Sequence, residues 1–134
     1  MPTTPASTVR RRSFCCVAHY DSSLPADLVS TLWSDPQSLI AQGKSLQAKG
    51  ARRTVRFEWN SQRFVLKHYR EPTRRHALKQ LIQPSRAWKT WQFTHRLVDA
   101  GVATPRPVAC VEKRWGLLRL DSFLVYPYIE GRTL

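Results

Sequence analysis

The stretch RFVLKHYREP, residues 63–72, places a single lysine directly after a run of apolar residues. Phe64, Val65 and Leu66 are typical of a strand that buries at least one face. Because side chains alternate along a strand, Lys67 is predicted to share a face with Val65. Either this lysine points to solvent or it reaches a ligand. On the strand alone, a lysine that points to solvent is the simpler interpretation.

The segment before this strand alternates in polarity over Thr54–Trp59. Val55, Phe57 and Trp59 are predicted to face one way, and the charged residues between them the other way. Residues 60–62 read as a turn, and a weaker strand is predicted at residues 45–48. Together these segments predict an antiparallel meander that ends with the lysine strand.

Two helices are predicted after the meander. The first covers residues 73–82, with Thr73 as the candidate N-cap. The second covers Arg86–Ala100, where Trp88, Trp91, His95 and Val98 recur at helical spacing and Gly101 follows as a helix terminator.

The last third of the chain returns to strands. Two prolines keep residues 102–107 extended, and strands are predicted at residues 108–112 and 117–128. We therefore expect an α+β fold, with an antiparallel five-stranded sheet and one or two helices between strands three and four. Before this domain, at residues 40–134, we expect a disordered basic tail at residues 1–13 and an extension at residues 14–39 with a short helix at residues 27–33.

Charge is the strongest global feature of the composition. The chain has 22 Lys and Arg against 9 Asp and Glu, a formal net charge of +13. Such a surface attracts polyanions, which include nucleic acid, anionic lipid headgroups and phosphorylated glycolipids. Charge alone does not choose among them.

The cysteines and the hydropathy pattern indicate the compartment. The chain has three cysteines, Cys15, Cys16 and Cys110, and two of them are adjacent. An odd count with an adjacent pair does not suit a disulfide framework, so a reducing compartment is expected. Cys15, Cys16 and His19 lack the second ligand cluster of a metal site, and no metal is predicted. No apolar run approaches the about 20 residues of a membrane span. We expect a cytoplasmic protein, free or at the surface of the inner membrane.

Three stretches of the chain resemble the lipopolysaccharide kinases, the Kdo/heptose kinase family with a protein-kinase-like fold. Residues 64–67, FVLK, are similar to the third-strand lysine motif. Residues 85–107 resemble the helix of that family and the G-x-x-x-P-R-P segment that follows it, and residues 122–131 resemble its fifth strand and hinge. The resemblance covers residues 40–134 and implies the small, N-terminal lobe of a kinase.

The resemblance implies that the chain binds ATP and that Lys67 points into a nucleotide cleft. A lysine suits the ATP phosphates as a compact point charge on a flexible stem. The implied phosphate-binding residues are Lys67, Gly50, Lys49 and Arg52, and the implied adenine and hinge residues are Val65, Tyr126, Pro127 and Ile129. At the hinge, the carbonyl of Pro127 and the N–H of Ile129 would meet the adenine, and proline keeps its carbonyl.

The chain departs from the kinase pattern in three ways. Residues 49–53 contain a single glycine where a glycine-rich loop is expected. Thr90 stands where the helix glutamate that pairs with the lysine is often found. The chain stops at Leu134, before the catalytic Asp and Asn and the metal-binding Asp of the large lobe, so no catalytic or Mg²⁺-binding residue is assigned. We expect the chain to be inactive alone and to require a missing lobe or second chain, with an anionic glycolipid as the family's acceptor.

Two other interpretations remain open. A basic nucleic-acid-binding module would contact phosphates through Arg10–Arg12, Arg52, Arg53 and Arg74-Arg75, with exposed aromatics stacked on bases. A non-catalytic remnant would expose an apolar docking surface and aggregate without a partner.

Overall fold

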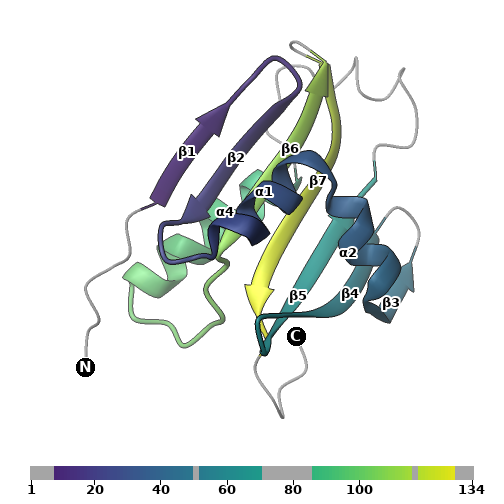
Figure 1. Cartoon of the computed structure of the whole chain (residues 1–134). Helices are drawn as coiled ribbons and strands as arrows, with labels where there is room; N and C mark the ends of the chain where they lie inside the picture. Colours follow the sequence, from purple (N-terminus) through teal and green to yellow (C-terminus); the bar gives the residue numbers. More distant parts are fainter. Residues whose placement is uncertain (1–7, 50–51, 71–85, 116–117, 129–134) are drawn as a thin grey trace.

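The chain folds around one seven-stranded antiparallel sheet with helices on both faces (Figure 1). The computed structural model describes residues 8–49, 52–70, 86–115 and 118–128. In spatial order the strands are β1 (Thr8–Arg12), β2 (Cys16–Asp21), β6 (Ala109–Trp115), β7 (Leu118–Pro127), β5 (Gln62–Tyr69), β4 (Arg52–Trp59) and β3 (Lys44–Lys49). The described helices are α1 (Ala26–Ser34), α2 (Pro36–Gln42) and α4 (Arg86–Asp99).

The five predicted strands all form, and they lie side by side as β6-β7-β5-β4-β3. The predicted strand number was nevertheless wrong, because β1 and β2 extend the sheet from five strands to seven. These two strands occupy residues that were predicted as tail and extension. β2 pairs with the edge of β6, and β1 pairs with β2. The arginine-rich β1 has little apolar alternation of its own and forms by hairpin pairing with β2, whose other edge pairs with the distant β6.

The hairpin of β4 and β5 has the alternation predicted for it. Val55 and Phe57 are buried, while Arg56 lies on the opposite face. Asn60 and Ser61 form a two-residue turn with φ angles of 51° and 65°. Positive φ at both turn residues is the geometry that matches the twist of paired strands. This turn fixes the register that places Lys67 opposite Thr54.

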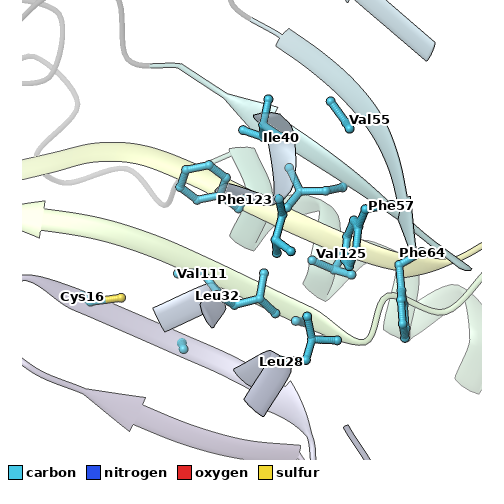
Figure 2. Packing of buried hydrophobic residues seen from close by; sticks show 14 residues of the cluster. Cys16, Leu28, Leu32, Ile40, Val55, Phe57, Phe64, Val111, Phe123 and Val125 are labelled. Carbon is cyan, nitrogen blue, oxygen red and sulfur yellow. The ribbon is translucent and has the colours of Figure 1, made fainter. Parts of the chain in front are cut away.

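The larger hydrophobic core lies between the sheet and the helices α1 and α2 (Figure 2). Leu28 and Leu32 of α1, the short helix predicted at residues 27–33, are buried there. Helix α2 was not predicted, because a proline shortly after a helix is typical of a helix end. Pro36 instead occupies the first turn of α2, where its missing N–H costs no hydrogen bond. The buried residues that form the rest of this core are Cys16, Ala18, Leu39, Ile40, Val55, Phe57, Phe64, Leu66, Ala109, Val111, Phe123 and Val125.

Helix α4 packs on the other face of the sheet and ends as the sequence predicted. Gly101 has a φ of +85°, which an L side chain rarely adopts. The N–H of Val102 donates to the carbonyl of Leu97 at 2.9 Å, and the N–H of Gly101 donates to that of Val98 at 3.0 Å. These two bonds form a Schellman cap. The other predicted helix, at residues 73–82, lies outside the described residues.

No described helix combines the length and the apolar character that a membrane span requires.

Gly43 connects α2 to β3 at a point where the backbone passes close to β4. A Cβ atom at this position would overlap Val55 Cγ1 and lie 2.8 Å from the Arg56 carbonyl oxygen. We predict that Gly43→Ala lowers the free energy of unfolding by about 2 kcal/mol, because overpacking a close contact forces the backbone to shift. Urea unfolding followed by circular dichroism measures this change. Ser45→Ala, at an exposed position two residues later, is the control. An equal loss of unfolding free energy in both variants would mean that the contact between Gly43 and β4 is not close.

Candidate functional site

The two faces of the sheet differ sharply in character. One face packs on α1 and α2 and is almost entirely apolar where it is buried. On the other, here called the α4 face, Val65, Leu124 and Tyr126 pack with Ala87 and Trp91 of α4. Helix α4 contacts mainly β6 and β7. The part of the α4 face over β4 and β5 carries a group of cationic side chains.

Three cations lie together on this part of the α4 face, and we call them the basic patch: Arg52, Arg56 and Lys67. The strand register pairs Thr54 with Lys67 and Arg56 with Val65. Since alternate residues share a face, Arg52, Thr54 and Arg56 of β4 lie on the same side as Lys67. Arg56 stacks over the ring of Tyr128, with 5.3 Å between its Cζ and the ring centroid. Like charges on neighbouring strands repel, so the patch favours an anion that neutralises it.

Lys67 is half-buried at the centre of this patch. Burial lowers the pKa of its ammonium group below the ordinary value, and the positive charge of Arg52 lowers that pKa further. Within the described ranges Lys67 makes no salt bridge. Its Nζ lies 5.2 Å from the centroid of the Tyr126 ring. A partly desolvated cation of this kind is available to bind an anionic ligand.

Tyr126 joins the lysine to the apolar interior of the α4 face. Its side chain is buried, with 6% of its surface exposed. Burial raises the pKa of its phenol to about 12, and a hydrogen bond from the side chain of Thr94 opposes part of that rise. Thr94 belongs to α4 and is itself buried. The phenol is therefore neutral at physiological pH and connects β7 to α4.

The structure brings together several residues that the sequence singled out. Lys67, Arg52, Val65 and Tyr126 share the α4 face, and Pro127 follows as the last residue of β7, opposite Phe64. The backbone of Lys49 pairs with Arg52 at the end of β3, but its side chain is outside the described set. Gly50 and Ile129 also lie outside the described residues.

Sequence reasoning missed four residues of this region: Thr54, Arg56, Thr94 and Tyr128. The two on β4 could have been found, because the period of two that assigned Val55 and Phe57 to the core assigns Thr54 and Arg56 to the lysine's face. Thr94 gave no signal in the sequence, where Thr90 was noted at the position of the helix glutamate. The buried residues of the described part of α4 are Ala87, Trp91 and Thr94.

Other polar groups lie away from the basic patch. His68 is on the opposite face, where its Nε2 is 2.8 Å from Asp121 and its ring stacks on Phe123. Glu112 is buried on the α4 face, 3.6 Å from the Arg114 guanidinium. Among the described residues no group of three His, Cys, Asp or Glu side chains could hold a metal ion.

Comparison with known proteins identifies relatives of this chain, although no protein-family model matches it. It is 34% identical over 104 residues to the lipopolysaccharide core heptose(I) kinase WaaP of Escherichia coli, a match that covers 72% of this chain and 39% of the relative. The protein of the same name from Escherichia coli strain K12 is 28% identical over 105 residues, which cover 72% of this chain and 40% of that one.

A solved structure, WaaP in complex with acyl carrier protein, aligns with this fold at a TM-score of 0.52 and 28% identity, covering 81% of this chain and 41% of that chain. The predicted resemblance to lipopolysaccharide kinases is thus confirmed, together with a kinase-like fold. The chain spans about two fifths of the length of these relatives.

The electrostatic coupling inside the basic patch is open to direct measurement. We predict that Arg52→Gln raises the pKa of Lys67, because the positive charge of Arg52 contributes to its lowering. Below that pKa the ammonium form is the one that binds anions, so the variant extends the charged form to higher pH. NMR titration of the Lys67 side-chain Cε resonance measures the change.

Arg53→Gln is the matched control for this titration. Arg53 is an exposed neighbour on the same strand, with its side chain on the opposite face. The Arg53→Gln variant therefore removes one positive charge, as Arg52→Gln does, from a side chain that does not face Lys67. Equal shifts from the two variants would mean that net charge, and not the arrangement of the patch, sets the pKa of Lys67.

Proposed function

We propose, from the kinship of this chain with lipopolysaccharide kinases, that it binds ATP on the α4 face. In this proposal it supplies the nucleotide-binding part of a phosphotransferase that acts on a sugar hydroxyl of the lipopolysaccharide inner core. The observation that carries the proposal is Lys67, a half-buried lysine that lies beside Arg52 and over Tyr126 in a strand similar to the kinase lysine strand.

The basic patch matches the chemistry of a triphosphate. Phosphoryl transfer depends mainly on positioning and on neutralising negative charge. Lys67 would provide a mobile point charge, and Arg52 would provide a planar fork suited to phosphate oxygens. Arg52 lies at the start of β4 and pairs with Lys49 of β3. It is therefore placed to supply charge where other kinases use a glycine-rich loop.

The adenine would occupy the same face, farther along the strands toward Pro127. Val65 lies two residues from Lys67 and opposite Tyr126. In this proposal Val65 contacts the base, and the backbone around Pro127 forms the hinge. The phosphate-binding roles of Lys49 and Gly50 and the hinge role of Ile129 are proposed from the sequence resemblance alone.

The remaining chemistry is proposed to come from outside this segment. In this proposal Mg²⁺ and the catalytic residues belong to the large lobe of the kinase pattern. We propose that the 134-residue chain binds ATP without transferring phosphate. A cytoplasmic location at the inner membrane, with the basic surface toward an anionic glycolipid, fits the net charge of +13. An acyl carrier protein accompanies the solved relative, and a protein partner of that kind is also proposed for this chain.

Polyanion binding is the second candidate, favoured by the exposed arginines of β1. Arg10, Arg11 and Arg12 are all exposed on this edge strand. The guanidinium of Arg11, however, lies over the ring of Trp33, with 4.2 Å between its Cζ and the ring centroid, and covers that face of the ring. Trp33, Trp59, Trp88 and Trp91 pack against the two cores. Base stacking of the kind seen in single-strand binding proteins would therefore fall to Phe14 and Phe93, which are exposed.

ATP binding by the wild-type chain and by Lys67→Met tests the proposed function. We predict that wild type binds ATP in isothermal titration calorimetry and that Lys67→Met weakens the affinity at least tenfold, because a charge-assisted hydrogen bond contributes about 1.5–3 kcal/mol. Lys89→Met, an exposed lysine on α4, is the control and should bind like wild type.

Three other results would each contradict part of the proposal. An equal loss of ATP affinity in Lys67→Met and Lys89→Met would indicate a nonspecific charge effect. Wild-type affinity in Lys67→Met would remove the lysine from the site. A folded wild type that ignores ATP but binds a single-stranded oligonucleotide, with an affinity that falls steeply as salt rises, would favour the polyanion interpretation.

A further inference from the structure

The proposed site leaves one structural problem unsolved, which is how Lys67 is held in place. A lysine side chain has several rotatable bonds and must be oriented to meet a phosphate. Helix α4 carries no glutamate, and its one acid, Asp99, is at the far end. Within the described ranges Lys67 makes no ion pair. Among the described residues, the contact that can orient Lys67 is of another kind.

The contact present in the structure is with an aromatic ring. Lys67 and Tyr126 lie on the neighbouring strands β5 and β7, where Lys67 is opposite Leu124 and Tyr126 is opposite Val65. The two side chains are thus diagonal neighbours on one face, and the ammonium nitrogen lies 5.2 Å from the ring centroid. This distance is within the range of a cation–π interaction.

The ring is itself anchored. Tyr126 packs among Val65, Ala87 and Trp91 and has only 6% of its surface exposed. The side chain of Thr94 on α4 bonds to its phenol oxygen. Packing and this bond hold the ring from the helix side, so the lysine contacts a fixed surface.

From this arrangement we propose that Tyr126 is a positioning residue that holds Lys67 in its phosphate-binding orientation, and that Thr94 connects α4 to the lysine through it. The inference rests on the proposed ATP site. It assigns to a tyrosine and a threonine the coupling of helix and lysine that protein kinases obtain from a carboxylate.

An aromatic anchor has a different chemical consequence from a carboxylate. A carboxylate accepts one or two of the three ammonium N–H bonds and places a negative charge near the anionic phosphates. A ring attracts the ammonium through its face and leaves the N–H groups free to donate to phosphate oxygens. The positive charge of Arg52, on the β4 side of Lys67, repels the ammonium toward the ring on β7.

The first test needs no ligand, because a ring current reports the contact directly. The εCH₂ protons of Lys67 in the free wild-type chain should resonate upfield of those of the exposed Lys89. Tyr126→Phe keeps the ring and should keep most of the upfield shift, whereas Tyr126→Leu should abolish it. An unchanged Lys67 resonance in a folded Tyr126→Leu variant would overturn the inference, whether or not the chain binds ATP.

The second test measures ATP affinity in the same variants by calorimetry. We expect Tyr126→Leu to weaken binding about five- to tenfold, Tyr126→Phe to remain within about threefold of wild type, and Thr94→Val to behave like Tyr126→Phe. Tyr20→Leu, which removes a half-buried tyrosine from the core on the opposite face, is the control for loss of packing and should bind like wild type.

The two tests separate failure of the inference from failure of the proposed function. If wild type binds ATP and a folded Tyr126→Leu binds it equally well, Tyr126 does not position the lysine, although the ATP site stands. If wild type does not bind ATP, the proposed function fails and with it the phosphate-binding role of the contact. If Tyr20→Leu weakens binding as much as Tyr126→Leu, general packing accounts for the effect and the positioning role is overturned.

Discussion

Burial of β5 and β7 on both faces is the constraint on which this structure depends. Leu66 and Val125 are fully buried against α1 and α2, and Val65 and Leu124 are buried against α4. A strand covered on both sides has little room for a charge, because an unpaired ammonium loses its hydration there. Lys67 is tolerated at the place where the cover of α4 gives way to the half-open surface over β4 and β5. That boundary defines the candidate site.

The same boundary explains why positive charges accumulate on one part of one face. Arg52, Arg56 and Lys67 lie on adjacent strands, and two of them rest on tyrosine rings at 5.3 and 5.2 Å. Such rings stabilise cations without neutralising them. Among the described residues these three cations form no salt bridge, and a bound anion would relieve their mutual repulsion. The relatives of this chain are kinases by name, and the nucleoside triphosphate proposed above is an anion of this kind.

The two N-terminal strands and the helices after them surround the kinase-like sheet. β1 and β2 extend the sheet beyond β6, while α1 and α2 cover the face opposite the candidate site. Hydrophobic cover of that face fixes the relative positions of β4, β5 and β7, because core side chains interlock closely. The register of these three strands brings Arg52, Lys67 and Tyr126 together. The extension therefore supports the site without contributing side chains to the basic patch.

The sequence by itself determined the elements whose signals are local. The alternation of Thr54–Trp59, the strand around Lys67 and the helix that ends at Gly101 follow from side-chain periodicity and from one backbone angle, and each is found in the structure. Only the tertiary structure decided the rest. β2 joins the sheet because the distant β6 offers an unpaired edge, and β1 follows through its hairpin with β2. Pro36 opens a helix because its neighbours bury Leu39 and Ile40, and Tyr126 meets Lys67 because two strands distant in sequence pair in one register. These outcomes depend on contacts between segments far apart in the chain, which no local pattern of residues encodes.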